Sequence, residues 1–231
     1  MENSLAIVMT KIPGVVAVKT RLGQLLSAEQ CDELATCFLL DTVAGLNDNF
    51  KNIAIAFTPD SGRLVLERIV GNEHKLFAQS DGDLGERLTE VIAEAFQSGF
   101  GPVIVVGTDS PTLPPEYLSQ ALDHLQRHAN GVTIGPTDDG GYYLIGVSSP
   151  PNGIFDNVEW STNKVFAQTV SNIERTGDLN LHVLPKWYDI DEPEDLFQLN
   201  AELLLSADTA ENTRRWLAGN QKIFDLASPA E

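Results

Sequence analysis

Short apolar runs alternate along the chain with longer segments in which apolar residues recur at helical spacing. Residues 5–9, 52–57 and 103–107 are predicted to be buried strands, because each is a continuous run dominated by apolar side chains. Residues 27–46 and 84–99 carry apolar positions three and four apart, the spacing of an amphipathic helix. This alternation predicts a parallel sheet with helices packed on both of its faces.

The same patterns predict the remaining elements. Helices are expected over 62–71, 114–128, 162–176 and 192–205, and strands over 75–79, 131–136, 141–147 and 181–185. The strands 131–136 and 141–147 flank the turn sequence Thr-Asp-Asp-Gly, which leaves no room for a crossover helix. We therefore expect an antiparallel strand within the sheet. The predicted fold class is α/β, a three-layer α/β/α sandwich with a mixed, mostly parallel sheet.

The chain is expected to form one principal domain. Its 231 residues and 42% hydrophobic content suffice for one large core, so residues 1–205 are predicted to be a single α/β domain. Residues 206–231 show one short helical pattern around Thr-Arg-Arg-Trp-Leu and then a polar tail that could act as an arm in a homodimer. Ser27, with Gln30 three residues later, predicts the start of the first long helix.

Charge and composition narrow the class of protein. The chain has 15 Lys and Arg against 33 Asp and Glu, a net charge of −18, so a basic face for nucleic acid is not expected. No apolar run approaches the roughly 20 residues of a membrane span, and the first residues lack the basic start of a signal peptide. Cys31 and Cys37 are expected to be reduced thiols, which is typical of a cytoplasmic protein.

Three loops follow predicted strands and are candidates for a ligand site, because ligands bind outside the carboxyl ends of strands in such sheets. They cover residues 10–21, 107–112 and 185–191. The first contains Lys19 and Arg21 in the sequence VKTRLG, two cations that can clamp phosphate oxygens. The alternative is an ordinary solvated loop.

Asp109 lies in the second loop, in the sequence GTDSP, and two roles are open for it. Asp109 or Ser110 can cap the helix that follows, with Pro111 in the first turn. A carboxylate at the end of a strand can also bind Mg²⁺, which prefers one or two carboxylates completed by water and substrate phosphates. The two roles are compatible.

Asp189 and Asp191 lie two residues apart in the third loop, in the sequence WYDIDEPEDL. In an extended segment their side chains point the same way. They are candidates to share a metal ion with Asp109. The alternative for Asp191 is the N-cap of the helix that follows.

The sequences GPTDDGGYYLIG and EWSTNKVF add candidates for ligand contact. Asp138 and Asp139 with Gly140 and Gly141 form a strong hairpin turn, but two glycines also allow a ligand to approach the backbone closely. In the second sequence Trp160 can belong to the core or stack on a ligand. The residues after it, Ser161 and Thr162, are candidate caps for the next helix.

Six segments in order resemble a bacterial family, the radical-SAM/selenodomain-associated transferases, within the glycosyltransferase-A-like and nucleotide-diphospho-sugar transferase superfamily. The segments are VKTRL, GDLGERL, VGTDSPTLP, GPTDDGGYYLIG, EWST and WYDIDEPEDL, spread over residues 5 to about 200. One departure concerns the first loop. Relatives commonly carry Pro-Gly where this chain has Val15 and Val16, which are stiff and branched.

The resemblance implies roles for particular residues. It implies a nucleotide near Lys19 and Arg21, with Asp83 and Arg87 of GDLGERL also expected to contribute to its binding. It implies Mg²⁺ or Mn²⁺ at Asp109, with Asp189 or Asp191 as partner. The segments around Gly140, Gly141, Trp160, Ser161 and Thr162 would line the acceptor side.

The leading hypothesis is a metal-dependent transferase that uses a nucleotide-activated donor and a small-molecule acceptor, with glycosyl transfer from a nucleotide-diphosphate sugar as the reaction. Asp138 or Asp139 would orient the acceptor hydroxyl. A second hypothesis is nucleotidyl transfer from a nucleoside triphosphate to a phosphorylated acceptor, with release of pyrophosphate. A third is a ligand-binding protein on the same fold without catalytic activity.

Overall fold

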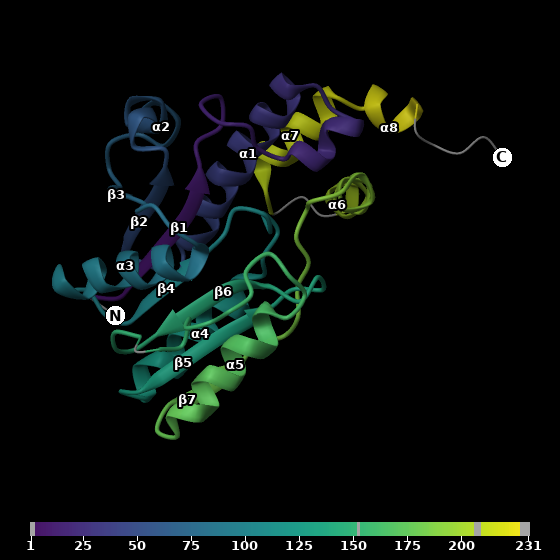
Figure 1. Ribbon diagram of the computed structural model, residues 1–231. Helices are drawn as coiled ribbons and strands as arrows, with labels where there is room; N and C mark the ends of the chain where they lie inside the picture. Colours follow the sequence, from purple (N-terminus) through teal and green to yellow (C-terminus); the bar gives the residue numbers. More distant parts are fainter. Residues whose placement is uncertain (1–2, 152, 206–208, 227–231) are drawn as a thin grey trace.

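The computed structural model describes residues 3–151, 153–205 and 209–226. Seven strands form one sheet in the order β3-β2-β1-β4-β6-β5-β7 (Figure 1). The strands are β1 (Leu5–Lys11), β2 (Asn52–Thr58), β3 (Lys75–Ala78), β4 (Val103–Val106), β5 (Gly131–Pro136), β6 (Tyr142–Val147) and β7 (Asn180–Val183). Within the described residues only β6 runs antiparallel to its neighbours, β4 and β5. The mixed, mostly parallel sheet is thus confirmed.

Helices cover both faces of this sheet, which makes the fold an α/β/α sandwich (Figure 1). One face packs against α1 (Ala28–Leu46), α2 (Arg63–Val70) and α4 (Pro115–Arg127). The other face packs against α3 (Leu84–Gln97) and α5 (Val165–Thr176). Two short 3₁₀ helices, η1 (Thr20–Gln24) and η2 (Asp60–Gly62), follow β1 and β2.

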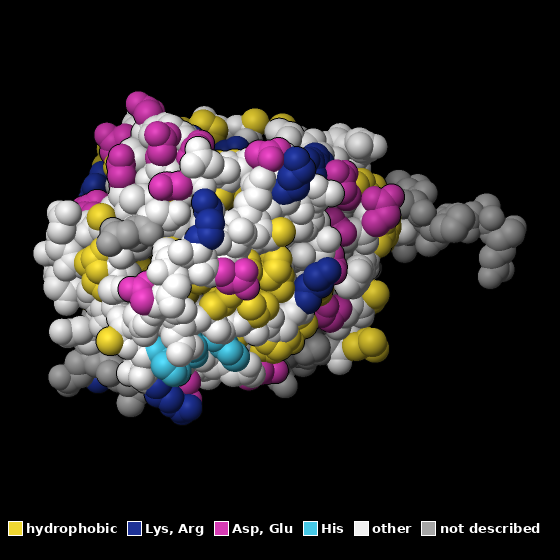
Figure 2. Space-filling model, turned by 60° about the horizontal axis from the view of Figure 1, so that its bottom comes forward, with side chains coloured by type: hydrophobic (Ala, Val, Ile, Leu, Met, Phe, Trp, Pro, Cys, Tyr) yellow, Lys and Arg dark blue, Asp and Glu magenta, His cyan; other side chains and the backbone are white. Residues whose placement is uncertain are grey.

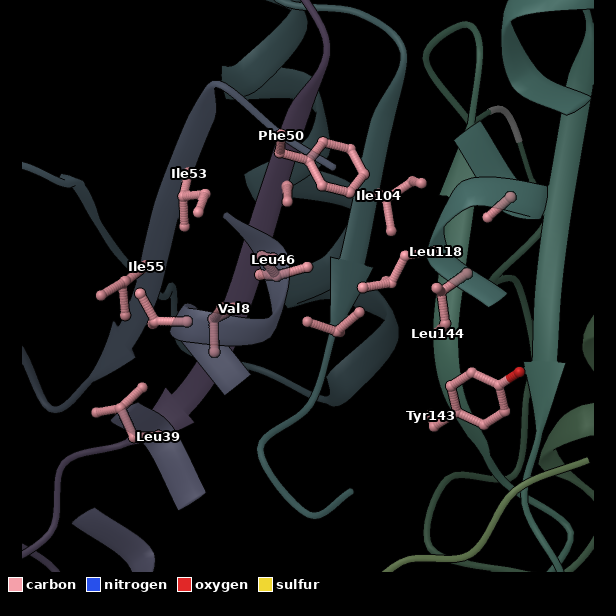
Figure 3. Packing of buried hydrophobic residues seen from close by; sticks show 14 of the residues in the cluster. Val8, Leu39, Leu46, Phe50, Ile53, Ile55, Ile104, Leu118, Tyr143 and Leu144 are labelled. Carbon is pink, nitrogen blue, oxygen red and sulfur yellow. The ribbon is translucent and has the colours of Figure 1, made fainter. Parts of the chain in front are cut away.

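Alternation of side chains along the strands fills two cores, one on each side of the sheet. Figure 3 shows the core beneath α1, where Val8 and Ile55 of the sheet meet Leu39 and Leu46 of the helix. Val8, Leu39 and Ile55 are fully buried. Burying each such side chain stabilises the fold by about 1.5–3 kcal/mol. At the start of α1, Ser27 and Gln30 form the expected capping box.

Three further helices, α6 (Pro193–Leu205), α7 (Glu211–Gly219) and α8 (Lys222–Leu226), extend the layer beyond α1 (Figure 1). Their apolar residues join Leu34 and Phe38 of α1 in a third buried cluster. The sequence indicated a polar tail where α8 forms. The helix is held by tertiary contact, because Phe224 packs edge-to-face on Phe197 with ring centroids 5.5 Å apart. The remaining tail, with the suggested dimer arm at 227–231, lies outside the described residues.

The structure also bears on the two cysteines and on membrane-spanning helices. Cys31 and Cys37 are both free thiols. None of the helices in the described part of the chain combines the length and apolar content that a bilayer span needs.

A buried carboxylate on α1 fastens α7 to the sandwich. Asp41 is 5% exposed, and its oxygens accept from the backbone amides of Asn212 (3.0 Å) and Thr213 (2.8 Å) and from the Asn212 side chain (2.8 Å). These amides are the unpaired donors at the start of α7, so Asp41 acts as an N-cap supplied by another helix.

Replacing Asp41 by alanine is expected to lower the free energy of unfolding by about 2 kcal/mol, because three donors, of which the Thr213 amide is buried, lose their acceptor. Asp41→Asn keeps one acceptor oxygen and should lose less. Urea denaturation measures the loss, and hydrogen exchange should show it first in the amides of α7. Equal stability of Asp41→Ala and the wild type would show that the cap contributes nothing.

Three histidines that are distant in sequence gather between α4 and the edge strand β7. The rings of His124 and His128 lie 4.4 Å apart, and those of His124 and His182 lie 5.1 Å apart. Figure 2 shows histidine side chains as one cyan patch on this face. Burial lowers the pKa of His182, and neighbouring His124 lowers it further.

This lowered pKa predicts a pH dependence of stability. Below the ordinary histidine pKa of about 6.5, His182 binds more protons in the unfolded chain than in the folded one, so its contribution to stability rises with pH from about 5 to 7. Urea unfolding across this range should show that the wild type gains more stability with rising pH, or loses less, than His182→Phe does. His74→Phe is the control, since His74 precedes β3 at the opposite sheet edge. An unchanged slope in His182→Phe would contradict the assignment.

Candidate functional site

The loops that follow β1, β4 and β7 meet at the carboxyl edge of the sheet, as the sequence predicts. Register places Val8 of β1 beside Val106 of β4, so both strands end at this edge. The backbone amide of Ile190 donates to the carbonyl of Asp109 (2.9 Å), which joins the second and third loops. The turn between β5 and β6 opens at the same edge, because Val106 also pairs with Leu144.

Two adjoining cavities open at this edge. The first, here called the basic cavity, measures about 530 Å³ and is lined by Lys11, Lys19, Arg21, Gln79, Leu84, Arg87, Asp109, Tyr142 and Asp191, among others. The second, the acidic cavity, measures about 720 Å³ and is lined by Asp109, Asp139, Gly141, Trp160, Ser161, Thr162, Asp189 and Asp191, and also by Lys11 and Arg21. Asp109 and Asp191 belong to both, so they lie at the junction.

Lys19 lies between the two junction carboxylates. Its ammonium forms an ion pair with Asp109, lies 3.3 Å from Asp191 Oδ1 and donates to the carbonyl of Ile190 (2.6 Å). Its side chain is only 6% exposed and packs over the ring of Phe38 at 5.3 Å. Lys19 thus holds the first and third loops to the second.

Arg21 is oriented differently from Lys19. It is exposed, and its Nη1 lies 3.5 Å from Glu192 Oε1 and 3.9 Å from Asp191 Oδ2. Such an exposed ion pair contributes little to stability. The guanidinium can therefore exchange its partners for a bound anion at small cost.

Lys11 and Arg87 are the cations of the basic cavity without a counter-charge. Among the described residues neither side chain has an ion pair or hydrogen bond, and the Nε of Arg87 is buried without a partner. An unsatisfied buried donor is costly, so an anion that filled the cavity would be favoured. The sequence indicated Arg87 through its motif, and Lys11 as one of the cations of the basic segment 1–24; the structure adds that Lys11 ends β1 at the ligand-binding edge.

Asp109 does not cap a helix. A turn follows it, in which the amide of Leu113 donates to the carbonyl of Ser110 (3.1 Å), and α4 begins only at Pro115 after Pro114 as N-cap. The Ser110 hydroxyl donates instead to the carbonyl of Tyr188 (2.8 Å). The capping role considered for Asp109 and Ser110 is therefore wrong, and the Asp109 carboxylate faces both cavities.

Asp189 and Asp191 line the acidic cavity, but they have different neighbours. Burial, followed by the charges of Asp139 and Asp191, raises the pKa of Asp189 to about 6. The cap of α6 comes from Asp195, whose Oδ2 accepts from the amides of Asp191 (3.0 Å) and Glu192 (2.7 Å). Asp191 itself contacts Lys19, so the capping role considered for it is not the one observed.

The turn between β5 and β6 separates the roles of its two aspartates. Asp139 Oδ1 accepts from the amide of Gly141 (2.9 Å) and from the Thr137 hydroxyl, which shapes the hairpin. Asp138 is exposed and pairs with Lys186 at 2.9 Å. Gly140 has φ +90°, and a Cβ on it would lie 2.2 Å from the Asn163 carbonyl oxygen. The space that Gly140 leaves open is therefore filled by the backbone of Asn163, not left free for a ligand.

Trp160, in the segment before α5, packs against Gly85 of α3 and lines the acidic cavity. A Cβ on Gly85 would lie 2.8 Å from the indole ring, and Tyr142 meets the ring edge-to-face with centroids 6.4 Å apart. Trp160 therefore packs on the core and also lines the cavity. The caps expected after it are wrong: α5 begins at Val165 after Lys164, without a side-chain cap, and the Thr162 hydroxyl donates to the carbonyl of Glu159 (2.7 Å).

Two other predicted positions have structural partners. The amides of Val15 and Val16 donate to the carbonyl of Ile12 at 3.2 and 3.3 Å, so the first loop uses them in its own turn. The side chain of Val15 packs against the first core. Asp83 caps α3 in a capping box with Glu86.

The expected metal ligands can be tested against this geometry. In the part of the chain that the structure describes, no group of three or more His, Cys, Asp or Glu side chains is placed to hold a metal ion. Asp109 and Asp191 nevertheless contact one cation, the ammonium of Lys19. Two carboxylates with substrate phosphates are sufficient for Mg²⁺, so this pair fits a divalent ion.

Comparison with known proteins places the chain in a family. Residues 42–162, more than half of the chain, match the family described as "Uncharacterized protein conserved in bacteria (DUF2064)". A crystal structure from Desulfovibrio desulfuricans G20, of a protein provisionally assigned as a nucleotide-diphospho-sugar transferase, is 30% identical. The match covers 98% of both chains with a TM-score of 0.88. No protein of curated function matches the sequence significantly.

More distant structures share the fold. A nucleotidyl transfer enzyme from Methanothermobacter is 14% identical over 89% of this chain and 99% of its own, with a TM-score of 0.59. Rv0371c from Mycobacterium tuberculosis H37Rv, solved as a manganese complex, is 15% identical over 85% and 97%, with a TM-score of 0.52. The association with radical-SAM and selenodomain proteins stays a prediction. The chain belongs to the DUF2064 family and has the fold of nucleotide-using transferases.

Proposed function

We propose that this protein is a metal-dependent transferase that passes a sugar from a nucleotide-diphosphate sugar to a small-molecule acceptor. The observation that carries the proposal is a pair of cations, Lys11 and Arg87, that have no partner among the described residues and share one cavity of a chain with net charge −18. In so acidic a protein, cations without a counter-charge at the ligand-binding edge favour a phosphate group.

The basic cavity suits the donor. Its volume of about 530 Å³ lies within the range usual for small-molecule sites. Ala17, Val18 and Leu84 offer apolar contact to a base. Lys11 and Arg87 would bind the diphosphate, and Arg21 can join them by leaving Glu192.

The junction carboxylates suit the metal. Asp109 and Asp191 would hold Mg²⁺ or Mn²⁺, which supplies Lewis-acid neutralisation of the diphosphate. Lys11 and Arg87 stabilise the same charge from the basic cavity as the diphosphate leaves. Because Asp109 and Asp191 line both cavities, they place the donor beside the acceptor.

The acidic cavity suits the acceptor. An acceptor oxygen forms a bond to the anomeric carbon, the bond from that carbon to the diphosphate breaks, and the hydroxyl proton passes to a carboxylate. Asp139 is the better candidate for this proton than Asp138, because it lines the acidic cavity while Asp138 is paired with Lys186. Ser161 and Thr162 also line this cavity.

Nucleotidyl transfer is the second candidate, because Lys11 and Arg21 line both cavities and can follow a longer phosphate chain. Product analysis with Mn²⁺ separates the reactions. Nucleotide sugars with an acceptor panel release a nucleoside diphosphate or monophosphate in glycosyl transfer, whereas nucleoside triphosphates release pyrophosphate in nucleotidyl transfer. If neither reaction gives its product and no nucleotide shifts the thermal unfolding of the protein, the non-catalytic alternative is favoured.

A further inference from the structure

We propose that Lys19 is an internal cation that occupies the Asp109–Asp191 pair in the ligand-free protein and makes divalent-ion binding depend on an anionic ligand. The inference rests on the proposed function, since it concerns the same two carboxylates. It adds an order of events that neither the fold nor the family supplies.

The position of Lys19 is fixed by its own loop and by α1. Its backbone is left-handed, with φ 47° and ψ 39°, which is unusual for a residue other than glycine. The Cys31 thiol donates to its carbonyl at 3.5 Å, and the ring of Phe38 of α1 lies 5.3 Å from its ammonium. These contacts direct the ammonium towards the junction without any ligand.

The charges explain why an ammonium belongs there. Asp109 and Asp191 are brought together by the backbone bond from Ile190 to Asp109, so their repulsion has to be offset. Lys19, with a side chain 6% exposed, in turn needs a counter-charge because an isolated buried ammonium is costly. Each partner therefore stabilises the other in the absence of a metal ion.

A divalent ion at this pair would compete with Lys19 for the same oxygens. If an anion in the basic cavity accepts the ammonium, the carboxylates become available and the competition ends. Metal ion and anion should then bind with positive coupling, typically 5- to 150-fold in affinity for coupled sites. The metal alone should bind weakly.

The test measures Mn²⁺ binding by electron paramagnetic resonance, with Mn²⁺ alone and with pyrophosphate as the anion. The wild type should bind Mn²⁺ weakly, and pyrophosphate should strengthen its binding by more than it does through Mn²⁺–pyrophosphate association in solution. Lys19→Met keeps the apolar stem and should bind Mn²⁺ alone about tenfold more tightly. Lys19→Gln should do the same, and circular dichroism checks that both variants are folded.

Lys186→Met is the matched control, because it removes a lysine that pairs with an aspartate, Asp138, outside the junction. It should change Mn²⁺ affinity by less than about twofold, an effect of net charge alone. Equal Mn²⁺ affinity in Lys19→Met and the wild type, or equal gains in the two lysine variants, would overturn the inference. A gain in Lys19→Met, together with no transferase product from the wild type with any donor and acceptor tried, would leave the inference standing and count against the proposed function.

Discussion

Replacing Asp109 by asparagine is expected to abolish metal-dependent nucleotide binding. Asparagine has a similar shape but lacks the charge that attracts a divalent ion. Loss of a direct ligand should exceed the 10- to 100-fold reduction in metal affinity that is typical when an outer partner is removed. Titration calorimetry with nucleoside diphosphates, with and without Mn²⁺, measures the loss.

The same substitution should lower the free energy of unfolding by less than the roughly 3–5 kcal/mol typical of breaking a buried ion pair. Asp109 caps no helix, its side chain is 49% exposed, and Lys19 retains Asp191 and the Ile190 carbonyl as partners. Urea denaturation provides this second measurement. A large loss of stability with intact binding would instead assign Asp109 a structural role.

Asp123→Asn is the matched control for this experiment. It removes one carboxylate of an exposed ion pair, with Arg127 at 2.9 Å, on the outer side of α4. The net charge changes equally in the two variants. Nucleotide binding should be unaffected in Asp123→Asn, so any effect of Asp109→Asn can be attributed to its position.

The fold could be predicted from sequence because its signals are local and repeated. Buried strands such as β1 and β4 are continuous apolar runs, and α1 begins at a capping box that is visible in the letters. Parallel strands end at one edge, so the meeting of the loops after β1, β4 and β7 followed from topology alone. The helix α8 lacked such a signal, since its place depends on Phe197 of another helix.

The partners within the site could not be predicted in this way. Lys19 and Asp191 are 172 residues apart, and nothing local shows that Lys19 contacts carboxylates rather than solvent. The extra turn from Ser110 to Leu113 also separated Asp109 from the helix it was considered to cap. Sequence patterns predict which charged residues lie at the carboxyl edge of the sheet. Which of them form ion pairs depends on how the loops pack against one another.

Arg87→Met is expected to weaken nucleoside diphosphate binding by about 10- to 150-fold, the equivalent of one lost hydrogen bond to a charged group. Its guanidinium lines the basic cavity with a buried Nε and no partner among the described residues, so a bound phosphate would be its first counter-charge. Methionine keeps the apolar stem. Affinity should also depend less on salt concentration in the variant.

Stability should respond in the opposite way to binding. Since Arg87 has no ion pair within the described part of the chain, Arg87→Met should leave the unliganded protein as stable as the wild type or more so. Arg68→Met is the matched control, because Arg68 is an exposed arginine of another helix, α2, without an ion pair among the described residues. It should preserve affinity and its salt dependence. If both variants bind equally well, the phosphate does not contact Arg87, and the donor must lie elsewhere along the carboxyl edge.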